Sequence, residues 1–208
     1  MTSLYHLDVR AQDVAARFGA EAGRDPWDGG YVAPARFAPV IVTGPDGGRR
    51  IVPRLWGVPP PPNAARMPDA RPVIHVRNLE SPFWIGTLRH RHLRCLVPAT
   101  AFPVWADAPD PATGKRARHR FSLPDRPLFA FAGIWRDSEV PSFAILTCEP
   151  NRMVGAVSAR TMPVILHREE EDDWLRADWA RARRLVAPYP SQLMAMDAAA
   201  PPRTGGDA

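Results

Sequence analysis

Proline interrupts this chain along most of its length. It accounts for 25 of the 208 residues, about 12% where roughly 5% is average. These prolines are spread through the chain instead of being gathered in one linker. Proline fixes the backbone angle φ and lacks the N–H donor that helices and central strands require. We therefore expect a strand-rich fold of short segments joined by fixed turns.

The length and composition are those of one globular domain. Hydrophobic residues make up 45% of the chain and charged residues 24%, close to the usual values of about 45–50% and 25%. A chain of 208 residues is near the size of one large domain of roughly 100–200 residues. We expect this domain to occupy residues 1–197. Residues 198–208 have no apolar periodicity, which predicts a disordered tail.

Membrane, disulfide, metal and cofactor signals are missing from the sequence. The longest apolar runs, at 128–131 and 163–166, are far shorter than the ~18 residues of a membrane helix, and no signal peptide is recognisable. Cys95 and Cys148 are too few for a disulfide framework. No CxxC, GxGxxG, Walker or HExxH pattern occurs. We expect a cytoplasmic protein without a membrane partner, a metal site or a cofactor.

Apolar periodicity predicts the main elements. A helix is expected at 11–22, where Val14, Phe18 and Ala22 share one face. A second helix should begin with the acidic run at 169–173, whose carboxylates suit the first turn of a helix better than a metal site, and should lead into Trp174 and Trp179. Turns are expected at 45–48 and 111–114. Strands are predicted at 38–42, 50–56, 73–76, 94–97, 102–106, 118–122, 129–135 and 142–147.

The positive charge is carried almost entirely by arginine. The net charge is +5, and Lys115 is the single lysine among 27 basic residues. One interpretation is codon bias in a GC-rich genome, which makes no functional demand. The other is phosphate recognition, because the guanidinium group binds phosphate oxygens in a bidentate manner and stacks on bases. The two interpretations are compatible.

A series of phrases in a fixed order carries a family resemblance. They are MTSLY (1–5), ARFG (16–19), Pro34 with APV (38–40), LWGVPPPP (55–62), VRN (76–78) with SPFW (81–84), RCLVP (94–98), RPLFAFAGIW (126–135), LT (146–147) with Asn151, and MPVIL (162–166). Together they resemble the SOS response-associated peptidase (SRAP) family. Each phrase is weakly specific, but their common order over most of the chain is strongly specific.

The resemblance implies a fold and a chemistry. The implied fold is a single strand-rich α+β domain with a barrel-like mixed sheet at its core and a few flanking helices. The implied activity is covalent capture of abasic sites in single-stranded DNA by a cysteine at position 2, exposed when Met1 is removed. Its α-amine and thiol form a ring with the sugar aldehyde, supported by an asparagine, a glutamate and a histidine.

All four implied catalytic positions differ in this chain. Position 2 is Thr2, the asparagine position is His75, the glutamate position falls near Val104, and the histidine position falls on Ser158. The framework phrases remain while these positions have changed. We therefore expect a degenerate crosslinking centre, that is, a pseudoenzyme.

The substituted residues keep limited chemical options. The Thr2 α-amine can form a Schiff base, but its hydroxyl is a much weaker nucleophile than a thiol; the alternative is an ordinary terminal residue packed into the fold. His75 is either an acid–base or phosphate-binding group or a structural histidine between two apolar neighbours. Ser158 has no base partner at a fixed spacing. His90 and His92 form a basic loop and lack a third metal ligand.

The resemblance also implies a DNA groove. Arg77 and Arg160 lie in phrases where the family has cations that bind the DNA backbone, and Pro34 and Trp56 resemble residues that line the groove. For Trp56 the alternative is a core position.

Three functions remain open from the sequence. The leading one is a degenerate SRAP-fold protein that still binds single-stranded or abasic-site DNA, as a monomer in the cytoplasm or with the nucleoid. The second is an active variant that forms a Schiff base through Thr2. The third is a regulatory or structural protein that acts through a protein partner.

Overall fold

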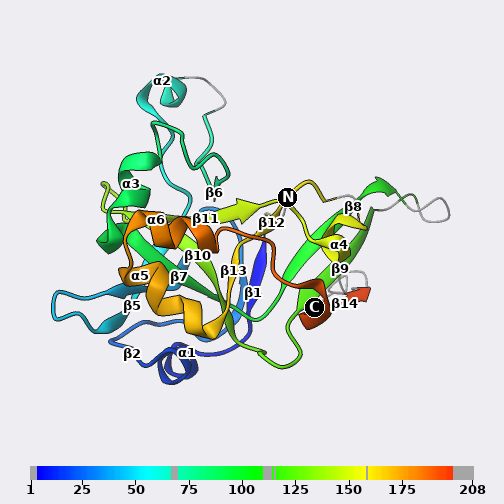
Figure 1. Cartoon of the computed structure of the whole chain (residues 1–208), viewed down its shortest axis with the longest axis horizontal. Coiled ribbons are helices and arrows are strands. Elements are labelled where there is room, and N and C mark those ends of the chain that lie inside the picture. Colours follow the sequence, from blue (N-terminus) through cyan, green and yellow to red (C-terminus); the bar gives the residue numbers. More distant parts are fainter. Residues whose placement is uncertain (1–3, 67–69, 110–113, 115, 158, 199–208) are drawn as a thin grey trace, which may run out of the picture.

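A computed structural model describes residues 4–66, 70–109, 114, 116–157 and 159–198 (Figure 1). The strands are β1 (Tyr5–Leu7), β2 (Ala20–Glu21), β3 (Gly30–Val32), β4 (Phe37–Thr43), β5 (Arg49–Trp56), β6 (His75–Val76), β7 (Arg94–Ala99), β8 (Phe102–Pro109), β9 (Arg116–Ser122), β10 (Phe129–Arg136), β11 (Ser142–Cys148), β12 (Met162–Pro163), β13 (Ile165–Leu166) and β14 (Ala195–Ala198). The α-helices are α1 (Ala11–Phe18), α2 (Pro62–Ala65), α3 (Ile85–Arg89), α4 (Arg152–Gly155), α5 (Glu171–Arg176) and α6 (Trp179–Ala182). The 3-10 helices are η1 (Arg91–Leu93), η2 (Arg168–Glu170), η3 (Arg183–Leu185) and η4 (Ser191–Leu193).

Five strands close into a ring. Antiparallel pairs join β4 to β5, β10 to β11, β7 to β10 and β4 to β7, and a short parallel pair joins β5 to β11. The pairing is therefore mixed, and the sheet is partly closed. Strand β2 extends the sheet beside β5, while β8, β9 and β14 form a separate antiparallel sheet. The predicted strand-rich α+β domain with a barrel-like mixed core is confirmed.

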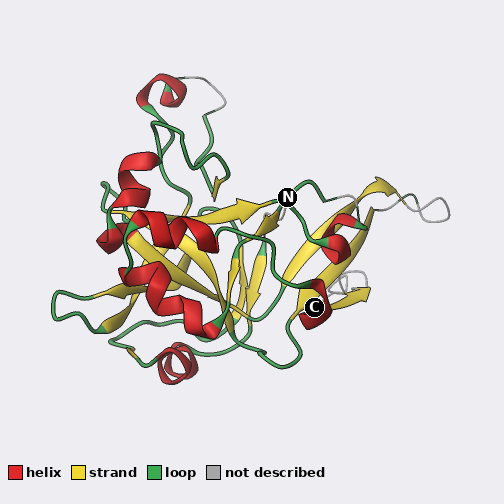
Figure 2. Cartoon of the chain, in the orientation of Figure 1, coloured by secondary structure: helices red, strands yellow, loops and turns green. Residues whose placement is uncertain are grey.

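The strands of the ring pack closely at Gly133 of β10, where Trp174 of α5 contacts them. A Cβ atom at Gly133 in β10 would lie 2.7 Å from Cγ2 of Val97 in β7, so only glycine fits there without a shift. Trp174 of α5 is fully buried, and its Nε1 donates to the carbonyl oxygens of Cys95 and Gly133 at 2.9 and 3.2 Å. In the view of Figure 2, α5 and α6 lie across the strands of the ring.

Most predicted strands are present, with small differences at their ends. The segments at 38–42, 50–56, 94–97, 102–106, 118–122, 129–135 and 142–147 all lie within strands of the structure. The predicted strand at 73–76 is shorter, because only His75 and Val76 pair with β11, while Val73 forms an isolated bridge with Val58. The turn at 45–48 joins β4 to β5, with Gly44 N donating to Gly48 O.

The first predicted helix is shorter in the structure, and the second is divided in two. Helix α1 ends at Phe18 and not at residue 22, because Gly19 adopts the left-handed conformation (φ 59°) and the chain continues into β2. The helix predicted to begin with the acidic run does have Glu171, Asp172 and Asp173 in the first turn of α5. An extended Ala177 separates α5 from α6, and Asp178 caps α6 by accepting a hydrogen bond from Arg181 N.

Some predictions fall partly beyond the described residues. Residues 111–113 of the predicted turn and residues 199–208 of the predicted tail lie outside them, whereas Ala198 belongs to β14. Within the described part of the chain, no helix is both long and apolar enough to cross a membrane. The same residues contain no group of three or more His, Cys, Asp or Glu side chains that could hold a metal ion.

Candidate functional site

The carboxyl end of β11 lies between two short strands that come from distant parts of the sequence. On one edge, Ile145 N donates to Ile74 O, next to β6. On the other edge, Val164 N donates to Leu146 O, next to β12. Successive residues of a strand direct their backbone groups to opposite edges, so β6 and β12 flank β11. Figure 1 shows the three strands in the same part of the view.

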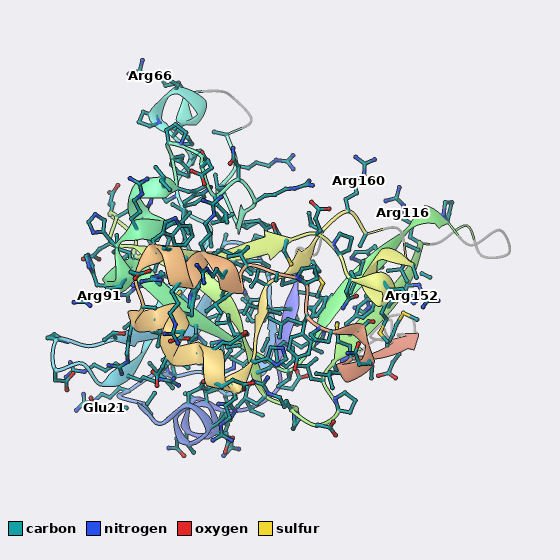
Figure 3. The ribbon with its side chains drawn as sticks, in the orientation of Figure 1. Glu21, Arg66, Arg91, Arg116, Arg152 and Arg160 are labelled. Atoms are coloured by element: carbon teal, nitrogen blue, oxygen red, sulfur yellow. The ribbon has the colours of Figure 1, made fainter. Side chains whose placement is uncertain are left out.

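This arrangement brings Arg77 and Arg160 to the same end of β11. Arg77 directly follows β6, and Arg160 lies two residues before the start of β12. The Arg77 Nη2 atom lies 3.4 Å from Oε1 of Glu149, the residue that follows β11, and both side chains are mostly exposed. Arg160 is exposed and forms no ion pair with a described residue. In Figure 3 its side chain projects away from the ribbon. Two accessible guanidinium groups therefore flank one strand end.

His75 is enclosed beside these arginines. Its Nε2 atom is buried and has no hydrogen-bond partner within the described structure, and its ring meets Trp56 edge-on at 6.0 Å. Burial lowers the pKa of His75 from 6.5 to about 4. The imidazole is therefore neutral at pH 7 and is poorly suited to donate a proton as an imidazolium.

Trp56 lies in the core and not on a surface groove. Its side chain is 0% exposed, stacks on Phe143 and donates from Nε1 to Ile74 O at 3.1 Å. The core interpretation therefore holds, and Trp56 contributes to the site by contacting the His75 ring and by holding the backbone before His75. Tyr5 packs against Trp56 at 5.3 Å, which places β1 beside this cluster.

The three remaining candidates from the sequence are Pro34, Thr2 and Ser158. Pro34 is half-buried in a loop that is joined to β5, because Ala35 N donates to Trp56 O at 2.9 Å. Ala35 has a positive φ of 60°, an unusual conformation for a residue other than glycine. Thr2 and Ser158 lie outside the described residues.

An exposed tryptophan next to the family's glutamate position was missed by the sequence interpretation. Val104 in β8 is 2% exposed, whereas the next residue, Trp105, is 43% exposed. Phe102, Pro103 and Val104 are all buried, so Trp105 is the first exposed residue of β8. The Arg118 guanidinium carbon lies 5.8 Å from the Trp105 ring centre. All five residues of 102–106 are apolar, so this segment has no alternation that could have identified Trp105 as exposed.

Further arginines occur on the side of the molecule that carries β8 and β9. In Figure 3, Arg116, Arg152 and Arg160 project on the same side of the view, around β8, β9 and α4. Arg116 and Arg152 are exposed. Exposed aromatic rings among arginines are typical of surfaces that bind single-stranded nucleic acids, where the rings stack on bases and the cations contact phosphates.

Comparison with known proteins gives a family and a fold. The family model described as "SOS response associated peptidase (SRAP)" matches residues 1–200. A solved protein from Bacteroides thetaiotaomicron is 22% identical, with a TM-score of 0.74 over 93% of this chain and 90% of that chain. A protein from Bordetella bronchiseptica is 20% identical, with a TM-score of 0.72 over 95% and 99% of the two chains.

A phage-related protein from the same organism is 20% identical, with a TM-score of 0.70 over 94% and 92% of the two chains. At sequence identities of 20–22%, the structural similarity is evidence for a shared fold only. No protein in the curated set matched significantly.

Proposed function

Because this chain belongs to the SOS response associated peptidase (SRAP) family, we propose that it binds single-stranded or abasic-site DNA and does not form the family's stable crosslink. The observation that carries this proposal is the position of Arg77 and Arg160 on either side of the end of β11. Strands lie about 4.8 Å apart, so β6 and β12 are separated by roughly 10 Å. Arginine side chains that extend from backbones this far apart can both reach phosphates of one DNA strand.

The exposed ring of Trp105 supports the same function. Stacking on an aromatic ring adds affinity without requiring a particular base. The ring would therefore complement the phosphate contacts of the two arginines.

The substitutions at the implied catalytic positions argue against a stable crosslink. Thr2 has no thiol to close a ring with the sugar, and Val104 cannot transfer a proton. His75 is neutral at pH 7 because its pKa is lowered to about 4 by burial. Capture of an abasic aldehyde would therefore end at a reversible Schiff base with the terminal amine.

DNA binding is tested by fluorescence anisotropy of a labelled single-stranded oligonucleotide over a range of salt concentrations. We expect Arg160→Gln to weaken binding about tenfold and to lower the salt slope by ~0.7 per lost phosphate contact. Arg24→Gln is the matched control, since Arg24 is also exposed and lies in the segment between β2 and β3. Equal losses in the two variants, or binding independent of salt, would contradict the proposal; the latter would favour a function through a protein partner.

The chemistry is tested with an oligonucleotide that carries one abasic site, followed by denaturing electrophoresis with and without borohydride. We expect no band of reduced mobility without borohydride. A band that appears only after reduction, and disappears when the N-terminus is blocked, would show a reversible Schiff base at the terminal amine. A stable band without borohydride would show that the crosslinking centre is still active.

A further inference from the structure

A separate pocket lies on the side of the molecule that carries α1. Its volume is about 440 Å³, and its wall includes Arg17 of α1, Arg126 and Leu128 of the β9–β10 connection, and Tyr189 and Leu193 near the end of the described chain. In Figure 1, α1 lies at the bottom of the view, while β6 and β12 lie above it. None of the residues that line this pocket belongs to the proposed DNA site.

Two arginines in the pocket wall share a single carboxylate. Arg17 Nη2 lies 2.7 Å from Oε1 of Glu171, and Arg126 Nη2 lies 3.8 Å from the same oxygen. Glu171 is 2% exposed, whereas the Arg17 and Arg126 side chains are 17% and 21% exposed. A third arginine, Arg49, also binds Glu171, but it has a second carboxylate, Asp172, at 3.1 Å.

The hydrogen bonds of these two arginines are incomplete. Nη1 of Arg17 and Nη2 of Arg126 are buried and have no hydrogen-bond acceptor within the described structure. A buried donor without an acceptor costs free energy, and this cost is greater for a charged group. One additional anion in the pocket would supply the missing acceptors after a small rotation of the guanidinium groups.

The rest of the pocket is suited to an apolar body. Leu123 and Tyr189 are buried in the wall, Leu128 is partly exposed, and Leu193 is 42% exposed. The Tyr189 ring is held by stacking on His167 at 4.5 Å. The wall also has three exposed charged residues that lie toward solvent: Asp125, Arg168 and Glu169.

We propose that this pocket binds a small carboxylate that carries an apolar side chain. The carboxylate oxygens would accept from Arg17 and Arg126, and the side chain would pack on Leu128 and Leu193. Charge-assisted bonds to arginine in a partly buried site favour a carboxylate over a neutral group. A free apolar amino acid and the carboxyl-terminal residue of a peptide both provide this chemistry.

The ligand class is tested by titrating the isotope-labelled full chain with three probes and following its NMR spectrum. N-acetyl-leucine and leucine carry the carboxylate, and leucinamide does not. We expect saturable shifts at Arg126 and Leu193 with a carboxylate probe and at least tenfold weaker binding of leucinamide. Stronger binding of leucine identifies a free amino acid, since the exposed Asp125 and Glu169 would attract its ammonium group, whereas stronger binding of N-acetyl-leucine identifies a chain terminus. Equal binding of leucinamide, or no saturable shift with any probe, overturns the proposal.

Two variants at one exposed position test the location. Leu193→Asp places a negative charge in the wall of the pocket that would bind the carboxylate, and Leu193→Asn has nearly the same shape without the charge. We expect the Asp variant to bind the carboxylate probe at least tenfold more weakly than the Asn variant, with an unchanged spectrum elsewhere. Equal binding of the carboxylate probe by the two variants would show that the probe does not bind in this pocket. Affinity for single-stranded DNA should be the same in both, which separates this proposal from the proposed function.

Discussion

Arg49 and Glu171 are 122 residues apart in the sequence and form an ion pair in the interior, with Arg49 Nη1 3.0 Å from Oε2 of Glu171. The two side chains are 14% and 2% exposed. Arg49 begins β5 and Glu171 begins α5, so the pair joins the ring of strands to the helix that covers it. Arg17 brings α1 to the same carboxylate. One glutamate therefore connects three elements of the fold.

Removing this carboxylate should strongly destabilise the protein. Glu171→Gln leaves Arg17 and Arg49 without their shared anion in a largely buried site, and breaking such a pair typically costs about 3–5 kcal/mol. Equilibrium unfolding in urea, monitored by tryptophan fluorescence, measures the loss. Asp172→Asn is the control, because Asp172 is 63% exposed and an exposed pair contributes at most ~1 kcal/mol. Equal losses in the two variants would contradict the structural role of Glu171.

The sequence could not have identified Glu171 among its neighbours. It belongs to a run of five consecutive acidic residues that all suit a helix N-terminus, and its partners lie in α1 and β5. Burial of one member of the run depends on how α5 docks on the ring. This docking is a tertiary property without a local signal.

The strands were more predictable than the site. Strands such as β4 and β5 are bounded by turn residues and contain β-branched side chains, and both signals are local. The meeting of Arg77 and Arg160 depends on a parallel pairing of only two residues between β6 and β11. A pairing of that length leaves no pattern in the sequence.

Acidification should destabilise the fold through His75. Its folded pKa is about 4, whereas an unfolded histidine has a pKa near 6.5. Between these values the unfolded chain binds a proton that the folded chain does not, so stability falls as the pH decreases from about 6.5 to about 4. The loss should approach ~3 kcal/mol. Urea midpoints measured at several pH values give the profile.

Burial also lowers the pKa of His6, so His6 contributes to the same loss of stability on acidification. A variant of His75 is therefore needed to separate the two contributions. His75→Gln should flatten the decline between pH 6.5 and 4, while the contribution of His6 remains. An unchanged slope in His75→Gln would show that His75 is not responsible for the pH dependence.

Trp105 should contribute to DNA binding without contributing to the core. Its ring is 43% exposed, and loss of one stacked base typically costs about 1–3 kcal/mol of binding free energy. We expect Trp105→Ala to weaken binding of a single-stranded oligonucleotide at least fivefold with little change in the urea midpoint. Tyr31→Ala is the control, since Tyr31 is 60% exposed and lies in β3. A similar loss in Tyr31→Ala would show that any exposed aromatic ring has this effect.

Glu149 should oppose DNA binding, because its carboxylate lies 3.4 Å from Arg77 at the end of β11. A DNA phosphate must compete with this carboxylate for Arg77 and is repelled by it. We expect Glu149→Gln to strengthen binding of single-stranded DNA about threefold at low salt. Glu139→Gln makes the same change of net charge in the β10–β11 turn, at the opposite end of β11, and should have a smaller effect. If the two variants strengthen binding equally, net charge governs affinity and the end of β11 is not the binding site.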